Sequence, residues 1–288
     1  VFGEGDIGQG AQTVLAQIVA EELDVGIKDV SVSGADTEHS PLSFGAYASR
    51  LTVIGGNAVR LAAQDARRQL LEAASERLEV RPEDLVLKNG FVFIKNAPDR
   101  KVSMGEAAEL HLLRKDGRPV VGHGVYDPPS DYVLDKELYG NFAPSYEFTA
   151  LAVEVEVDME TGTIEMLGAW VADDVGFVLN PLLAEGQVHG ALVQGLGFAL
   201  TEGILFSEGQ ALNGNLADYT LPKAESTANL ESILIESNDP LGPYGAKGAS
   251  EAPIDPAAAA VANAVYHATG VRICDLPITA QKLRSSLS

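Results

Sequence analysis

The sequence has 288 residues, of which 46% are hydrophobic and 6% aromatic, so it can bury a large core and is not a disordered tail. Lys and Arg number 20 against 41 Asp and Glu, and the resulting net charge of −21 repels nucleic acids and anionic membrane surfaces. The single cysteine, Cys274, excludes an internal disulfide and a cysteine-held iron–sulfur cluster, and no apolar stretch reaches the roughly 18 residues of a membrane span, so we expect a cytoplasmic protein.

The N-terminal region combines a strand-like end with a glycine-rich turn. Val1-Phe2 resembles the end of a strand whose beginning is missing, which predicts that the chain is one piece of a larger polypeptide or assembly. Gly8-Gln9-Gly10 opens a helix with one apolar face. The free N–H groups of such a helix start suit a phosphate, although a turn of this kind is more often only a turn. Alternation predicts a strand over residues 29–33.

A second helix is predicted from about Ala46 to Glu79, with small residues first and strong helix formers later. In that helix Ser49 and Thr52 lie three residues apart, so their hydroxyls could hold a polar ligand at its N-terminal end. The alternative is that the small residues only permit close helix packing, and the sequence does not decide between the two.

Scaffold elements follow. Residues 86–93 predict a hairpin with an Asn89-Gly90 turn, and Ser103 with Glu106 predicts a capping box at the start of a short helix. Residues 119–144 predict no regular element beyond a strand at 120–125, and they form a candidate binding loop or boundary between two lobes, 1–145 and 146–288.

The second half predicts a hairpin of residues 149–158 and 164–171, a strand at 230–236 and three helices. The helices begin after Pro181, at about Ala257 and at Thr279, and residues 272–274 predict a short extended segment. Together these elements predict an α+β fold with mixed sheets and packed helices. The helix after Pro181 carries more glycine than its own stability favours, which indicates that something packs closely against it.

Residues 242–251 place an ammonium, Lys247, and a carboxylate, Glu251, in a run of small residues that can approach a ligand closely. The structural alternative is a simple turn, with Glu251 complementing the dipole of the helix that follows. The five histidines show no metal-ligand spacing and are interpreted as structural or exposed.

Five blocks in order along the chain resemble the molybdenum-cofactor subunit of the xanthine dehydrogenase and aldehyde oxidoreductase family, specifically its C-terminal half. The blocks are residues 5–10 with Thr13, Ala48-Ser49-Arg50 with Thr52, residues 186–191 with 194–197, residues 245–248 with Glu251, and residues 275–279. The resemblance implies that 1–288 is the second molybdopterin-binding domain of such a subunit.

By this resemblance the cofactor is a molybdenum–molybdopterin, in many bacterial members a cytosine dinucleotide, and the pterin dithiolene holds the metal without a protein ligand. The residues that match the family's cofactor contacts are Gly8, Gln9, Gly10, Thr13, Ala48, Ser49, Arg50, Thr52, Gln187 and Gly248.

Glu251 matches the family's catalytic base, which implies hydroxylation of an N-heterocycle or aldehyde with water-derived oxygen. Glu251 would deprotonate the metal-bound hydroxyl, and hydride would pass to the sulfido ligand. We expect Glu251 to be buried in a dry loop and Lys247 to point away from it. Ser250 departs from the family's usual glycine and is similar to the 4-hydroxybenzoyl-CoA reductase branch.

The resemblance also implies partner chains that carry the N-terminal molybdenum domain, a [2Fe-2S] cluster and FAD. Two other functions stay open at this point. One is reductive dehydroxylation of an aromatic acyl-CoA, and the other is a non-catalytic scaffold.

Overall fold

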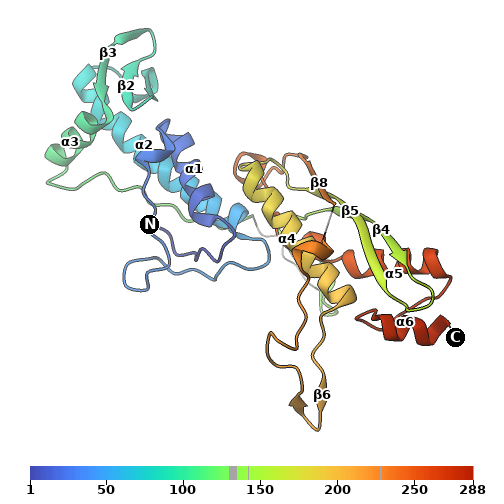
Figure 1. Ribbon diagram of the computed structural model, residues 1–288. Helices are drawn as coiled ribbons and strands as arrows, with labels where there is room; N and C mark the ends of the chain where they lie inside the picture. The colour runs from blue at the N-terminus through green and yellow to red at the C-terminus, as the bar shows by residue number, and fades with distance from the viewer. Residues whose placement is uncertain (130–134, 142, 228, 288) are drawn as a thin grey trace. The chain divides into compact units, whose positions relative to one another are not determined.

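The structure, a computed structural model, describes residues 1–129, 135–141, 143–227 and 229–287 (Figure 1). It divides into two compact units. Unit 1 comprises Val1–Ser145 and Asn238–Ala246, and unit 2 comprises Tyr146–Ser237 and Lys247–Ser288. The sequence assigned residues 238–246 to the second lobe, whereas in the structure this segment returns to unit 1.

Unit 1 packs helices against a small antiparallel sheet of order β1-β2-β3. Its core consists of apolar side chains from α2, α3 and the sheet, among them Leu70, Ala74, Leu87, Val92 and Ala107. The elements are α1 (Ala11–Leu23), η1 (Ile27–Asp29), η2 (Leu51–Gly55), α2 (Gly56–Leu78), η3 (Pro82–Asp84), β1 (Leu85–Lys88), β2 (Phe91–Ile94), β3 (Ala97–Ser103), α3 (Met104–Arg114) and η5 (Pro243–Gly245).

Two local predictions in unit 1 are confirmed. Asn89 and Gly90 both have positive φ, 49° and 75°, as a type I′ turn requires between β1 and β2. The Ser103 hydroxyl accepts the Glu106 N–H while the Glu106 carboxylate accepts the Ser103 N–H, which completes the predicted capping box.

Other local predictions are wrong. Residues 29–33 form no strand, since the only pairing recorded there is an isolated bridge between Phe2 and Gly34. The predicted helix at Ala46 begins as a π-turn at Leu51, because Ala48 and Ser49 adopt left-handed φ values that a helix cannot contain. Residues 120–125 form no strand. Residues 272–274, predicted as a short extended segment, belong to no helix or strand, and that prediction stands. Of residues 119–144, positions 130–134 and 142 lie outside the described residues.

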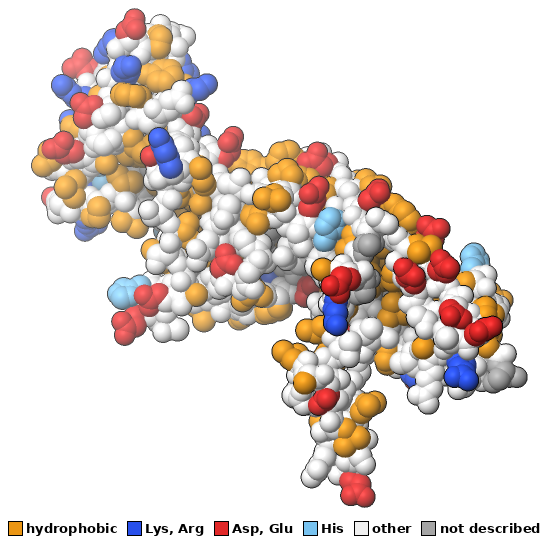
Figure 2. Space-filling view, in the orientation of Figure 1, with side chains coloured by type: hydrophobic (Ala, Val, Ile, Leu, Met, Phe, Trp, Pro, Cys, Tyr) orange, Lys and Arg blue, Asp and Glu red, His pale blue; other side chains and the backbone are white. Residues whose placement is uncertain are grey.

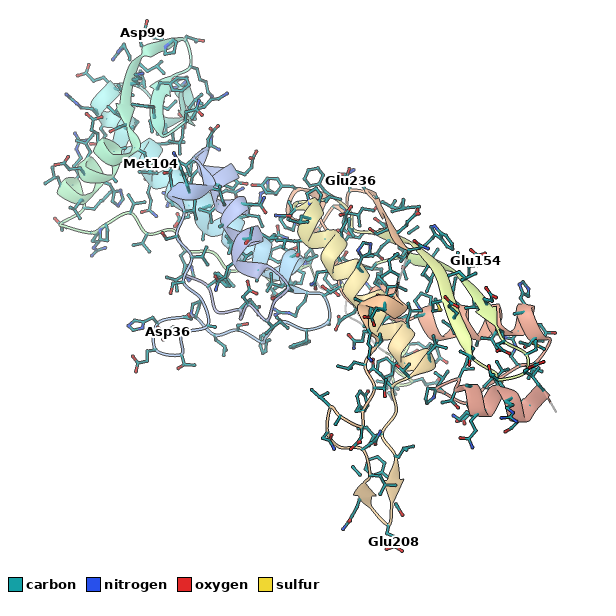
Figure 3. The ribbon with its side chains drawn as sticks, viewed as in Figure 1. Asp36, Asp99, Met104, Glu154, Glu208 and Glu236 are labelled. Atoms are coloured by element: carbon teal, nitrogen blue, oxygen red, sulfur yellow. The ribbon has the colours of Figure 1, made fainter. Side chains whose placement is uncertain are left out.

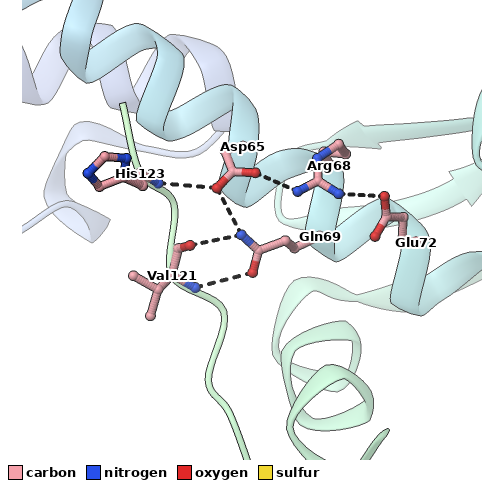
Figure 4. A network of polar contacts seen from close by, with 6 residues as sticks. All are labelled: Asp65, Arg68, Gln69, Glu72, Val121 and His123. Atoms are coloured by element: carbon pink, nitrogen blue, oxygen red, sulfur yellow. Dashed lines mark hydrogen bonds and ion pairs between the residues drawn. The ribbon is translucent and has the colours of Figure 1, made fainter. Parts of the chain in front are cut away.

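The extended segment 121–124 is held along α2 by side chains that replace a strand partner (Figure 4). The Gln69 amide donates to the Val121 carbonyl at 2.8 Å and accepts the Val121 N–H at 3.3 Å. Asp65 accepts the His123 N–H at 3.2 Å. A Cβ added at Gly124 would lie 2.0 Å from the Ala58 carbonyl oxygen, so only glycine allows this approach.

The returning segment Asn238–Ala246 is attached to unit 1 by polar contacts. Asn57 donates to the Leu241 carbonyl at 2.7 Å, and the Tyr244 hydroxyl donates to Glu22 at 2.8 Å. Arg60 pairs with the same Glu22 carboxylate at 2.6 Å and lies over the Tyr244 ring. These contacts hold Tyr244 at a φ of 56°, which a non-glycine residue rarely adopts.

Unit 2 is built on a three-stranded sheet of order β4-β5-β8, in which β4 and β5 are antiparallel and β5 and β8 are parallel. The strands are β4 (Thr149–Val157), β5 (Ile164–Asp174) and β8 (Leu230–Ile235). The helices are α4 (Pro181–Leu200), α5 (Ala257–Thr269) and α6 (Ala280–Leu287), with short η4 (Ala224–Ser226) and η6 (Ala252–Ile254). Fully buried Val171, Leu192, Val261 and Leu283 join sheet and helices in one core.

The fold class is confirmed as α+β, and so are the predicted hairpin, β8 and the three helices of unit 2. A ribbon of β6 (Phe206–Ser207) and β7 (Gln210–Ala211) extends from this unit. Leu205, Phe206 and Leu212 are exposed on it, and hydrophobic side chains are visible along it in Figure 2. Within the described ranges, no helix combines the length and apolar character needed to cross a bilayer.

We predict that Gly124→Ala destabilises the protein by about 1–3 kcal/mol, because its methyl group would collide with the α2 backbone. Gly105→Ala in α3 is the matched control. Its Cβ meets nothing within 4 Å, and alanine favours a helix over glycine by about 1 kcal/mol. Thermal unfolding should show a lower midpoint for the first variant and an equal or higher midpoint for the second. Equal midpoints for the two variants would contradict the packing described for segment 121–124.

Candidate functional site

The loop that carries Glu251 is anchored in unit 2 at the end of β5. The Lys247 N–H donates to the Val175 carbonyl at 2.8 Å. The Lys247 ammonium donates to Asp174 Oδ2 at 2.7 Å and lies 5.3 Å from the centre of the Phe148 ring. Lys247 therefore pairs with Asp174, in keeping with the prediction that it points away from Glu251.

The Lys247–Asp174 pair is buried, with 7% and 13% of the two side chains exposed. Burial by itself acts to raise the pKa of Asp174. Hydrogen bonds from Lys247, the Ser237 hydroxyl and the Gly176 N–H outweigh it, so the pKa lies below the usual range. Asp174 is thus charged at neutral pH and fixes the loop electrostatically.

Gln187 on α4 and Ser250 in the loop meet although 63 positions separate them in the sequence. The Ser250 hydroxyl donates to Gln187 Oε1 at 3.2 Å. Glu251 follows at once, and its carbonyl accepts the Ile254 N–H at the start of η6. The predicted burial of Glu251 is wrong for this chain, because its side chain is exposed just before η6.

Two further carboxyl groups lie near this loop, and sequence reasoning missed them. Burial, with neighbouring Asp173 and Glu251, raises the pKa of Glu147 to about 7, against the opposing effect of the Ala252 N–H and Lys247. Burial and Asp174 raise the pKa of Asp173 to about 6, against the opposing effect of Thr149 and Lys247. The only signal in the sequence was an acidic residue, Asp173, continuing an apolar strand.

In unit 1, the carboxylate of Asp6 accepts backbone N–H groups of the glycine-rich turn before α1 and of the start of that helix. Asp6 accepts the Gly8 N–H at 3.0 Å and the Gln12 N–H at 3.1 Å. Hydrogen bonds from Gln12, Gly8 and Gly10 lower the pKa of Asp6 despite some burial. The Gln9 amide accepts the Ile7 N–H and donates to the Gly5 carbonyl. A phosphate at this helix start would therefore compete with Asp6 for the same N–H groups.

The second predicted block of unit 1 forms a strained turn. Ala48 and Ser49 have φ values of 53° and 48°, a conformation that costs roughly 1–3 kcal/mol for each non-glycine residue and often marks a functional site. Arg50 donates to Glu4 Oε1 at 2.7 Å and to the Gly45 carbonyl at 2.9 Å. Thr52 lies in the following π-turn, and Thr13 is exposed on α1.

The predicted site residues thus form two groups, one in each unit. Gln187, Gly248 and Glu251 belong to unit 2, where the structure brings Gln187 to the residue before Glu251. The remaining residues belong to unit 1, where they lie in two turns and in the first residues of the helices α1 and η2 that follow them. These are Gly8, Gln9, Gly10, Thr13, Ala48, Ser49, Arg50 and Thr52.

The glycines of α4 test whether a ligand fits beside Gln187. Gly195 is required by packing, because a Cβ there would lie 2.5 Å from Ala257 Cβ. A Cβ added at Gly186 or Gly190 would meet nothing within 4 Å, so this chain does not itself require glycine at either position. Each costs the helix roughly 1 kcal/mol relative to alanine. Gly186 and Gly190 therefore leave open space next to Gln187 on α4. A molecule that approaches this part of the helix closely would account for glycine at both positions.

Protein side chains offer no alternative metal centre in the part of the chain that the structure describes. No group of three or more His, Cys, Asp and Glu residues there is arranged to hold an ion.

Comparison with known proteins places these residues in a wider context. Residues 1–228 match the family model of the molybdopterin cofactor-binding domain. Over 287 residues the chain is 36% identical to the 6-hydroxypseudooxynicotine dehydrogenase complex subunit gamma of Paenarthrobacter nicotinovorans, covering 98% of this chain and 35% of that protein. It is 35% identical to the putative xanthine dehydrogenase molybdenum-binding subunit XdhA of Escherichia coli strain K12, covering 98% and 36%.

Among solved structures, quinoline 2-oxidoreductase from Pseudomonas putida 86 matches with a TM-score of 0.84 and 28% identity, covering 98% of this chain and 36% of that one. The chain therefore spans about a third of the length of the relatives that it matches.

We predict that Lys247→Met destabilises the protein by about 3–5 kcal/mol, because it leaves the buried Asp174 carboxylate without its partner. The pair stabilises the protein fully at pH values above the ordinary pKa of an aspartate. This stabilisation is lost as the pH falls through the lowered pKa that Asp174 has in the folded protein. The difference between wild type and variant should therefore shrink in acid. Denaturant unfolding at several pH values measures this.

Lys282→Met is the matched control, because its partner Asp275 is 81% exposed and such a pair contributes at most about 1 kcal/mol. An equal loss of stability in the two variants would contradict the anchoring role of Lys247.

Proposed function

Because this chain belongs to the molybdopterin cofactor-binding family of molybdenum-dependent oxidoreductases, we propose that it carries the catalytic base of a molybdenum hydroxylase. The observation that supports this most is the hydrogen bond between Ser250 and Gln187. It joins the residue before the proposed base, Glu251, to the proposed cofactor contact on α4. Two parts of the chain that the resemblance assigns to one site, and that lie 63 positions apart in the sequence, are thus neighbours.

Molybdenum–molybdopterin is the cofactor that the family supports, and when bound it supplies a Lewis acid and an acceptor for two electrons. We propose that Gln187 contacts it, with Gly186 and Gly190 leaving room beside α4. In this proposal Gly248, which has no side chain, allows close approach of the loop. The turns of unit 1 around Gln9 and Ser49 would bind pterin and phosphate groups. The cytosine dinucleotide form of the cofactor stays a proposal.

In this proposal the Glu251 carboxylate removes a proton from the attacking, water-derived oxygen. Its exposure on this chain leaves it accessible to a substrate and a cofactor. Ser250 and Gln187 fix the backbone just before it, and Lys247 fixes the loop three residues further back. A base held in this way needs little reorganisation when the substrate arrives.

The proposed substrate is an N-heterocycle or an aldehyde. The name quinoline 2-oxidoreductase supports the heterocycle, and the name of the dehydrogenase complex subunit supports a heteromeric assembly. We propose that [2Fe-2S] and FAD chains receive the electrons and that an N-terminal molybdenum domain completes the site. A cytoplasmic location stays a prediction.

Reductive dehydroxylation of an aromatic acyl-CoA is the second candidate, favoured only by Ser250 in place of the family's usual glycine. Turnover in water labelled with a heavy oxygen isotope separates the two reactions. A hydroxylase places the labelled oxygen in its product, whereas a dehydroxylase does not.

We predict that Glu251→Gln lowers turnover of the assembled enzyme by at least about 100-fold, the usual contribution of a general base. The amide keeps the size of the side chain but cannot take the proton. Glu231→Gln, an exposed change on β8 in the same unit, is the matched control and should leave turnover unchanged. Molybdenum content should be equal in wild type and both variants.

Unchanged turnover in Glu251→Gln at full molybdenum content would reject the proposed base and favour a non-catalytic scaffold. A loss of molybdenum together with turnover would instead assign Glu251 to cofactor retention.

A further inference from the structure

Glu147 lies two residues before β4, and its carboxylate reaches the loop that carries Glu251. It accepts a hydrogen bond from the backbone N–H of Ala252, the residue that follows Glu251. Ala252 is also the first residue of η6, which packs against α4, α5, β4 and β5. Glu147 therefore contacts the backbone directly after the proposed base, while Ser250 is held directly before it.

The surroundings of Glu147 disfavour its negative charge. Glu147 Oε1 is buried and meets no hydrogen-bond partner among the described residues. Asp173 is fully buried, and neither of its oxygens has a partner there that satisfies hydrogen-bond geometry. The charged groups that face Glu147 are Asp173 and Glu251, which repel its charge, and Lys247, which attracts it. The ammonium of Lys247 is already engaged by Asp174.

We propose that Glu147 is a positioning residue for Glu251, which holds the backbone of the loop through Ala252 and places an ionisable carboxyl group beside the base. The proposal rests on the proposed function of Glu251. Nothing in the family resemblance assigned Glu147 a role, and its contribution follows from the hydrogen bond, the buried oxygen and the neighbouring carboxylates.

The ionisation of Glu147 falls in the range where an enzyme works, since its surroundings raise its pKa to about 7. Below that pH the carboxyl group is neutral. Above it, Glu147 carries a negative charge near Glu251, and this charge attracts the proton that is transferred to the loop during turnover. We therefore expect turnover to rise as Glu147 loses its proton.

The test is Glu147→Gln in the assembled enzyme. The amide oxygen can still accept the Ala252 N–H, whereas the ionisable group is gone. Glu154→Gln is the matched control, because Glu154 is an exposed carboxylate on β4 of the same unit (Figure 3). Two readouts are needed, one of which does not depend on turnover.

The first readout is an infrared titration of protonated carboxyl groups from about pH 5 to about pH 9. Wild type and Glu154→Gln should show a carboxyl band component that disappears near pH 7, where the pKa of Glu147 lies, and Glu147→Gln should lack that component. The component of Asp173, whose pKa is raised to about 6, should remain in all three proteins. The second readout is the pH profile of turnover. We expect Glu147→Gln to lose the rise near that pH and to be slower by about 3- to 10-fold on the alkaline side.

A component that still disappears near pH 7 in Glu147→Gln, or a pH profile that keeps the shape of the wild type, would overturn the proposal. A uniform loss at every pH would likewise reduce Glu147 to a structural residue. The failure of the proposed function is distinguishable from these outcomes. In that case Glu251→Gln retains turnover, while the infrared titration of Glu147 proceeds as expected.

Discussion

The buried ion pair between Lys247 and Asp174 is the contact on which the proposed site depends. After the segment Asn238–Ala246 the chain returns from unit 1 to unit 2, and Lys247 is the first residue of this second segment of unit 2. Its backbone and its side chain both contact the end of β5, through Val175 and Asp174. This attachment of Lys247 also positions Ser250 and Glu251, because only Gly248 and Ala249 lie between Lys247 and Ser250.

The loop is surrounded by more carboxylates than its single ammonium can neutralise. Asp174 takes the direct contact with Lys247. Burial and neighbouring carboxylates raise the pKa of Glu147 to about 7 and that of Asp173 to about 6, so both keep protons up to higher pH than ordinary carboxylates. Groups that titrate near neutrality next to a proposed base are typical of catalytic sites, although structural networks also produce them. The geometry of the backbone and the charge around Glu251 are therefore set by the same few residues.

Sequence reasoning succeeded where local rules decide the structure. The Asn89-Gly90 turn, the Ser103–Glu106 cap and the alternation of β4 depend on neighbours along the chain, so their patterns were sufficient. It failed at Ala48 and Ser49, whose left-handed φ values no propensity predicts for these residue types. Glu147 escaped notice because its burial and its contact with Ala252 depend on tertiary packing across about a hundred residues.

The return of Asn238–Ala246 to unit 1 has a consequence for how the polypeptide acquires its structure during synthesis. The contacts of Asn57 with Leu241 and of Glu22 with Tyr244 cannot form until the intervening strands and helix of unit 2 have been made. Translation supplies about 5–20 residues each second, so the early helices wait on the order of ten seconds for these partners. Until then the ends of α1 and α2 that receive the segment remain open to chaperones.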